Sequence, residues 1–109
     1  MSDTTDATTT PADDEIRVVD NQTRSRYEAR LGERVLGIVD YTLDANAGRI
    51  VLVHTEVQPD AEGSGVGSHL AKGALGNVRA RGLKLTVVCP FIGAYLKRHR
   101  GDYEDLLAP

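Results

Sequence analysis

The sequence predicts a single α/β (α+β) domain, in which an antiparallel meander of strands is followed by a helix, a strand and a second helix. Polar and apolar residues alternate through the first half of the body, as in half-buried strands. A glycine-rich loop then leads into a segment with helical spacing. The chain has 109 residues, which is enough for one core and no second one.

Short turns divide the first half of the chain into sequential strands. We expect strands at Ile16–Val19, Arg26–Leu31, Val35–Leu43 and Arg49–Val57. The turns between them are expected at Asp20-Asn21, Gly32-Glu33 and Asp44–Gly48. Sequential strands joined by such short turns pair in an antiparallel meander.

The second half alternates helix and strand. Gln58–Gly67 is expected to be a loop, and apolar spacing predicts a helix from Val66 to Arg81, with Gly82 just past its end. Leu83–Val88 reads as a strand, and Pro90–His99 reads as a helix that begins with a proline. Adding these elements to a meander gives a mixed layer of helices on a sheet.

Acidic residues concentrate at the N-terminus. Met1–Glu15 carries five of the 16 acidic residues and none of the 13 basic ones, so the remainder is mildly basic although the formal net charge is −3. Residues 1–14 lack apolar periodicity and are predicted to be a disordered acidic tail before a domain at 15–109. A mildly basic body suits a polyphosphate ligand. It lacks the dense Lys/Arg stripe of a nucleic-acid binder.

Several classes of protein do not fit the sequence. Cys89 is the single cysteine, which excludes an intramolecular disulfide and a multi-cysteine metal site. No apolar run is long enough to span a membrane, and the acidic N-terminus has no hydrophobic segment of a secretory signal. We therefore expect a cytoplasmic protein with no metal, membrane or nucleic-acid partner.

The loop from Glu62 to Ser68 is the most informative stretch. It follows a strand and opens a helix, where unpaired backbone N–H groups and the helix dipole favour an anion. Its three glycines allow the main chain to approach a phosphate closely, and the hydroxyls of Ser64 and Ser68 are possible further donors. Ser68 occupies the third glycine position of the Rossmann pattern, and the Lys of a Walker loop is missing. A glycine-rich turn without a ligand is the alternative.

Three separated motifs narrow this choice. Val57-x-Pro59 followed by Glu62–Gly67 resembles the acetyl-CoA signature of GNAT acyltransferases. The runs His54–Val57 and Cys89–Ile92, with Tyr95 and His99, resemble the minimal YjdJ-type GNAT group in the same order. This likeness covers most of residues 24–107. It implies a reduced version of the GNAT-like acyl-CoA N-acyltransferase fold, with acetyl-CoA (coenzyme A) as acyl donor.

The resemblance also implies where the donor binds. The pantetheine arm would lie along a bulged strand at Thr55, Glu56 and Val57. The diphosphate would sit over the loop residues Glu62, Gly63, Ser64, Gly65, Val66, Gly67 and Ser68. Glu62 departs from the Arg or Gln that is usual in the family, which brings a negative side chain close to the diphosphate. The chain is also shorter than a full GNAT domain, so the acceptor cleft should be open or completed by something else.

Acyl transfer to an amine needs a base and a donor for the leaving side. Cys89 ends a strand directly before a proline that starts a helix, a capping position that stabilises a thiolate able to accept the acyl group; a small buried filler is the alternative. His54 and Glu56 share one strand face as a candidate base pair. Glutamate is rare in a core without a partner, which favours a functional role for Glu56, whereas His54 has a structural alternative.

Residues of the two predicted helices complete the set. Tyr95 is a candidate donor to the departing thiolate, with simple packing as its alternative, and His99 is expected to complement the helix dipole. The basic side chains Lys72, Arg79 and Arg81 are candidates for contacts with the phosphates, although charges on a helix surface are usually only solvated.

These observations predict an acyltransferase that moves an acetyl (acyl) group from acetyl-CoA to an amine acceptor. The base would be Glu56 or His54 in direct attack, or the acyl group would pass through Cys89. A non-catalytic acyl-CoA-binding module or sensor is the first alternative, and a nucleotide-binding regulatory domain is the second. The protein is expected to be a monomer or homodimer. The acceptor and the acyl chain length are left open.

Overall fold

The computed structural model describes residues 16–107, so the tail predicted for residues 1–14 lies outside the described range. The elements run in the order β1 (Arg17–Asn21), β2 (Arg26–Leu31), β3 (Arg34–Asp44), β4 (Arg49–Val57), a 3-10 turn (Pro59–Ala61), α1 (Val66–Ala80), β5 (Lys84–Val87), α2 (Pro90–Arg98), α3 (Arg100–Tyr103) and a second 3-10 turn (Glu104–Leu106). The predicted order of strands and helices is confirmed as far as α2, whereas α3 and the second 3-10 turn were not predicted.

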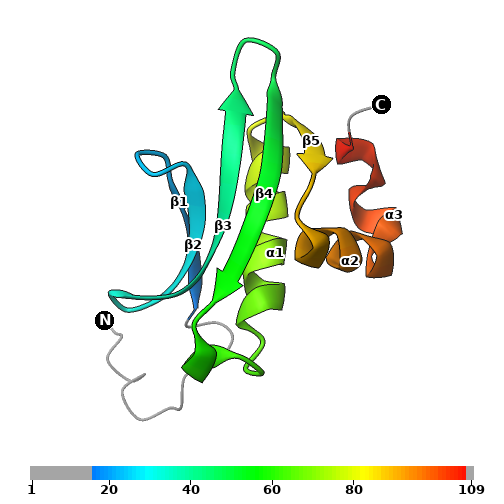
Figure 1. Ribbon diagram of the computed structural model, residues 1–109. Helices are drawn as coiled ribbons and strands as arrows, with labels where there is room; N and C mark the ends of the chain where they lie inside the picture. The colour runs from blue at the N-terminus through cyan, green and yellow to red at the C-terminus, as the bar shows by residue number, and fades with distance from the viewer. Residues whose placement is uncertain (1–15, 108–109) are drawn as a thin grey trace, which may run out of the picture.

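The five strands form one sheet in the order β1-β2-β3-β4-β5. The first four pair antiparallel, and β5 joins β4 in parallel after the crossover through α1. Figure 1 shows α1 behind the sheet, with α2 and α3 beyond β5 on the C-terminal side. No helix of residues 16–107 crosses the opposite face in this view. We call the face on α1 the inner face and the other one the outer face.

The core lies between the inner face and α1. Tyr27 and Val39 project from neighbouring strands toward α1, and the Tyr27 hydroxyl donates to Asn77 Oδ1 of α1 at 2.8 Å. The helix buries apolar residues at helical spacing, namely Val66, Leu70, Ala71, Ala74, Leu75 and Val78. Each large aliphatic side chain of this kind contributes roughly 1.5–3 kcal/mol on burial. This packing fixes the start of α1 against the middle of the sheet.

β4 carries a bulge that sets the geometry of the site. Asp40 of β3 lies opposite His54, whereas Tyr41 lies opposite Leu52, so Val53 is an extra residue in β4. The extra residue shifts the alternation, which places Thr55 on the inner face together with Leu52 and places His54 on the outer face.

The pairing of β4 with β5 stops at the same place. Its last pair is Leu52 with Val87, and the amides of Val88 and Cys89 both bond to the Leu52 carbonyl. From Val53 to Val57, β4 therefore has β3 on one side and no strand on the other within residues 16–107. One edge of this segment is open for another extended chain.

Two turn predictions need correction. The expected turn at Asp20-Asn21 is wrong, because β1 continues through Asn21 and the chain turns at residues 22–25. Asp20 accepts a hydrogen bond from the Tyr41 hydroxyl at 2.7 Å, and the Asn21 side chain accepts one from the Arg24 amide at 3.2 Å. Both polar residues therefore stabilise the end of β1. The expected loop at residues 58–67 also contains a 3-10 turn.

Candidate functional site

A cavity of about 320 Å³ lies where the end of β4 meets the glycine loop and α2. It is lined by Thr55, Val57, Ala61, Glu62, Gly63, Gly65, Val66, Gly67 and Phe91. The fold thus brings together two of the three predicted strand residues and most of the predicted loop. We call this space the first cavity.

The backbone of the loop is arranged for an anion. Gly63 and Gly65 both have φ +86°, and a Cβ at either would meet no atom within 4 Å, so the loop faces open space. The first backbone bond of α1 runs from the His69 amide to the Gly65 carbonyl at 3.1 Å. Within residues 16–107, no atom accepts a hydrogen bond from the amides of Gly63, Gly65, Val66, Gly67 and Ser68. Unpaired amides at a helix start suit a phosphate group, so these residues fit a diphosphate.

The polar side chains of the loop differ in whether they face a cavity. The Ser64 hydroxyl donates to the Ala61 carbonyl at 2.5 Å, so it holds the turn closed. Ser68 lines a second cavity of about 370 Å³ with Gly65, His69, Lys72, Tyr95 and His99. Glu62 is exposed and lines the first cavity. Lys72 shares this second cavity with Gly65 and Ser68, so it is the predicted basic residue that lies near the loop.

Phe91 closes one wall of the first cavity and was missed by sequence reasoning. Its ring lies directly against Gly67, where a Cβ would come within 2.6 Å of the Phe91 Cζ atom. Glycine at position 67 therefore permits the close approach of α2 to α1. The signal in the sequence was a large aromatic residue immediately after the helix-starting Pro90.

Cys89 holds the predicted capping position of α2 but is buried. Its carbonyl accepts from the Gly93 amide at 3.0 Å, and the residue is 2% exposed. The Thr55 hydroxyl lies 3.0 Å from the Cys89 sulfur. Thr55 lines the first cavity and Cys89 does not, so the hydroxyl stands between the thiol and the open space.

Tyr95 lies away from the first cavity. Its ring stacks on His99 with centroids 4.3 Å apart, and both residues line the second cavity. Burial, together with the neighbouring Tyr103, raises the pKa of Tyr95, so the hydroxyl stays protonated at neutral pH. His99 caps the end of α2, and its amide bonds to the carbonyls of Tyr95 and Leu96.

His54 and Glu56 form a pair on the outer face. The His54 Nε2 atom lies 2.9 Å from Glu56 Oε2, and the Glu56 side chain is 68% exposed. The argument that burial favours a role for Glu56 is therefore wrong. Its main chain runs beside the first cavity with Thr55 and Val57, but its side chain lines an outer-face groove instead.

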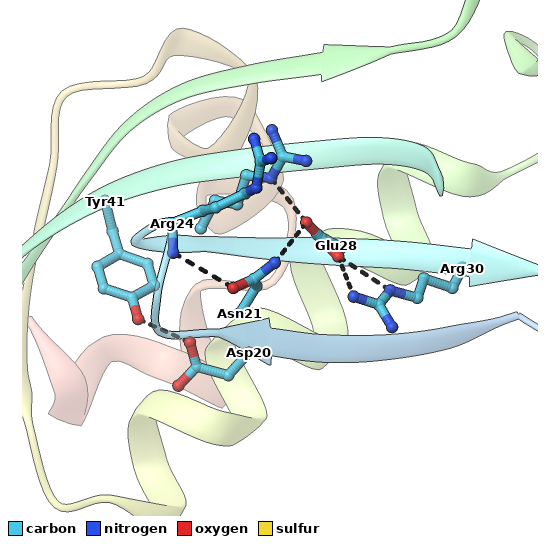
Figure 2. Close-up of polar contacts among 7 residues, drawn as sticks. Asp20, Asn21, Arg24, Glu28, Arg30 and Tyr41 are labelled. Carbon is cyan, nitrogen blue, oxygen red and sulfur yellow. Dashed lines mark hydrogen bonds and ion pairs between the residues drawn. The ribbon is translucent and has the colours of Figure 1, made fainter. Parts of the chain in front are cut away.

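Glu28 is a buried charge that sequence reasoning missed (Figure 2). It accepts from Arg26 Nε at 2.7 Å, Arg30 Nε at 2.9 Å and Asn21 Nδ2 at 3.0 Å. Burial alone raises the pKa of Glu28, but the hydrogen bonds from the two arginines and the asparagine outweigh it and lower the pKa to about 2. The available signal was Arg-x-Glu-x-Arg on one face of a strand.

Two of the basic candidates on α1 serve other parts of the fold. Arg79 pairs with Asp105 at 2.7 Å, and Arg81 pairs with Asp20 at 2.8 Å. Both lie at the C-terminal end of α1, opposite the loop. The expectation that Arg79 and Arg81 contact phosphates there is therefore wrong.

In the part of the chain that the structure describes, no group of three or more His, Cys, Asp or Glu side chains is placed to hold a metal ion. No helix there combines the length and the apolar character needed to cross a membrane.

Comparison with known proteins decides the family. A model of the GCN5-related N-acetyl-transferase family matches residues 26–106. The chain belongs to this family. The predicted GNAT resemblance is thereby confirmed, and acyl transfer is the general activity of the family.

Relatives and a solved structure agree with the GNAT assignment. Protein NATD1 of Mus musculus is 35% identical over 88 residues, which span 77% of this chain and 76% of the mouse protein. Protein NATD1 of Homo sapiens is also 35% identical over 88 residues, covering 77% of this chain and 74% of the human protein. The solution structure of a protein from Staphylococcus aureus described as a GCN5-like N-acetyltransferase matches with a TM-score of 0.60. That match covers 86% of this chain and 89% of the other at 20% identity, and it confirms the GNAT-like fold.

Proposed function

We propose that this GNAT chain transfers an acetyl or other acyl group from its coenzyme A thioester to a primary amine. The observation that carries the proposal is the set of unpaired amides at Gly63 and Gly65–Ser68, which opens α1 beside the first cavity. A diphosphate is the ligand chemistry that this arrangement favours.

The residues have distinct roles in donor binding. The amides of the loop would hold the diphosphate, and Lys72 would add a positive charge from the second cavity. The open edge of β4 between Val53 and Val57 would pair with the pantetheine arm, as in the family. Thr55 is the hydroxyl that lines the first cavity, and it would donate a hydrogen bond to the thioester.

Acyl transfer forms a C–N bond, breaks the thioester C–S bond, removes a proton from the amine and gives one to the departing sulfur. We assign the first proton to the His54–Glu56 pair, in which Glu56 orients the imidazole. Direct attack is the favoured route, because the Cys89 thiol lies behind Thr55. The second proton would come from solvent or from the Thr55 hydroxyl, since Tyr95 lines the other cavity.

A binding module without turnover is the second candidate. The Glu62 carboxylate lines the first cavity and brings a negative charge toward the diphosphate site. This charge would weaken donor binding, and among residues 16–107 no helix lies on the outer face to close over an acceptor. Both features suit a sensor that needs modest affinity.

A stability screen tests donor binding. Acetyl-CoA should raise the melting temperature of the protein, because a ligand at 100 times its Kd stabilises the folded state by about 2.7 kcal/mol. ATP and NAD at equal concentration should produce little shift. Absence of a shift with saturating acetyl-CoA would remove both the transferase and the sensor.

Two glycine variants sharpen the screen. Gly65→Ala and Gly82→Ala each place a Cβ at positive φ with no neighbour within 4 Å, so each should cost about 1–2 kcal/mol of stability. Only Gly65→Ala lies in the loop, and only it should reduce the shift with acetyl-CoA. Equal shifts in the two variants would contradict the assignment of the loop.

Turnover separates the transferase from the sensor. Release of free coenzyme A thiol from acetyl-CoA is measured with a panel of primary amines and compared with the rate without amine. The proposal expects stimulation by at least one amine class. Donor binding without stimulation by any amine would leave the sensor.

A further inference from the structure

A groove of about 250 Å³ lies on the outer face, directly across β4 from the first cavity. It is lined by Arg26, Val35, Gly37, Ile38, Glu56, Val57, Gln58 and Pro59. Val57 lines both the groove and the first cavity, so the two spaces meet at the end of β4. The groove is smaller than the pockets that take drug-sized ligands, which suits a small acceptor.

The groove has opposite charges on its two sides. Glu56 projects from β4, and Arg26 projects from β2 on the far side of β3. Ile38 lies between these two strands, directly opposite Glu56 in the register, and Val35 adds a second apolar side chain. Arg26 and Glu56 form no ion pair with each other: Arg26 pairs with Glu28 through Nε, and Glu56 contacts His54 through Oε2 while its side chain stays 68% exposed.

Arg26 is held in place for such a contact. Its Nε atom donates to Glu28 at 2.7 Å, and its two Nη groups have no acceptor among residues 16–107. The buried Glu28 thus fixes the guanidinium while leaving its outer edge unused. Arginine in this state is suited to bind a carboxylate.

We propose that the groove binds the acyl acceptor, and that the acceptor is an amino acid with a free carboxylate. Its carboxylate pairs with Arg26, its hydrocarbon part lies on Ile38 and Val35, and its ammonium group faces Glu56. This inference rests on the proposed function, because it supplies the substrate of that reaction.

The outer face is the side from which an acceptor can reach the thioester. The inner side of the β4 end opens into the first cavity, which the donor would fill between the loop, the start of α1 and Phe91. The His54–Glu56 pair lies on the outer face and takes the ammonium proton. The freed nitrogen lone pair then forms the C–N bond as the C–S bond breaks, and the second proton of the nitrogen passes to the departing sulfur through the Thr55 hydroxyl or solvent.

The experiment compares acceptors that differ by one carboxylate. Thiol release from acetyl-CoA is measured with lysine against cadaverine and with β-alanine against ethylamine. For each pair we expect the carboxylate-bearing amine to have a KM lower by about tenfold or more, as for a charge-assisted hydrogen bond. Equal KM values within both pairs would overturn the proposal.

Arg26→Gln and Arg30→Gln form a matched pair of variants. Both remove one partner of Glu28, but Arg30 does not line the groove. Arg26→Gln should abolish the KM advantage of the carboxylate, whereas Arg30→Gln should retain it. Arg26→Lys keeps the charge if Arg26→Gln fails to fold, and it should lose part of the advantage because the planar fork is gone. The same loss in Arg30→Gln would overturn the assignment.

Binding without turnover separates this inference from the proposed function. Wild-type protein without acetyl-CoA is titrated with lysine and with cadaverine while backbone amide shifts are followed by NMR. Lysine should shift the amides of Arg26, Ile38 and Glu56 more than cadaverine does. Failure to shift them, in protein that still binds acetyl-CoA, would overturn the groove assignment and leave donor binding intact.

Discussion

Glu28 and Glu56 occupy equivalent places on the outer face but have opposite environments. Both lie opposite Ile38 in the sheet register, one on β2 and the other on β4. The Glu28 side chain is 2% exposed, whereas that of Glu56 is 68% exposed. The difference comes from the residues two positions away on each strand, because these share its face. Arginines flank Glu28 on both sides and cover it.

Glu56 is contacted by His54 on one flank, and its neighbour on the other flank is Gln58, which lies just past the end of β4. The Glu28 carboxylate is therefore enclosed by its ion pairs, whereas the Glu56 carboxylate is exposed and can contact a ligand. Two identical side chains in one cross-strand row can thus serve stability and chemistry separately. The neighbouring side chains decide which glutamate is buried, because the two backbone positions are equivalent.

The largest expected effect is on stability when Glu28 is removed. Glu28→Ala leaves Arg26 and Arg30 as neighbouring positive charges without their shared partner. Breaking a buried pair in this way typically costs about 3–5 kcal/mol. Denaturant unfolding followed by circular dichroism measures the loss, with Glu56→Ala as the control on the same row. Similar losses in the two variants would show that the environments do not differ in energy.

Acid unfolding gives a second test of the same carboxylate. A carboxyl whose pKa is lower in the folded state adds stability above its unfolded pKa, here about 4.5, and this contribution disappears as the pH falls to about 2. The lowered pKa corresponds to roughly 3 kcal/mol at most. Unfolding free energy should therefore fall across this window in wild type and more shallowly in Glu28→Gln. A slope unchanged by Glu28→Gln would contradict the lowered pKa.

Glu56→Gln should separate stability from activity. Its carboxylate is exposed, so stability should change by only about 0.5 kcal/mol or less. If Glu56 works with His54 as the base, kcat should fall by about 100-fold or more. Thermal unfolding and thiol release measured on the same preparation test both parts. A fully active Glu56→Gln variant would remove the pair from the mechanism.

The strand order and the loop could be predicted because their signals are local. Alternation located β2 to the residue, apolar content after a turn cluster located β4, and the glycines after β4 located the start of α1. Gly82, expected just past the helix, has φ +69° as such a position requires. The glycine-rich composition of the loop predicts an anion site, and its unpaired amides fit one.

The features that the sequence did not predict depend on how the strands pair and on contacts between distant residues. The GNAT resemblance implied a bulged strand, but the position of the bulge at Val53 has no local signature, and that position decides that Thr55 faces the cavity and Glu56 faces away. Likewise, burial of Glu28 requires two arginine side chains to fold over one carboxylate, which alternation alone does not indicate. The shielding of Cys89 by Thr55 joins residues 34 positions apart. Side-chain direction at the site was therefore less predictable than the fold.

The smallest expected effect is that of Cys89→Ser. The new hydroxyl is close in size to the thiol and retains a hydrogen bond to Thr55, so stability should fall by only about 1 kcal/mol. Under direct attack from the outer face, the thiol takes no part in bond making. The rate of thiol release should then change by less than about tenfold, against the 100-fold or larger loss expected for the base.

Mass spectrometry completes this test, because the two routes differ in a covalent species. Wild-type protein mixed with acetyl-CoA in the absence of amine should keep its mass when the acyl group passes directly. An acetyl group on Cys89 that is lost on adding amine, together with an inactive Cys89→Ser variant, would replace direct attack by double displacement. The exposed Glu56 would then have to activate the amine in the second step alone, so Glu56→Gln should slow removal of that acetyl group and leave its formation unchanged.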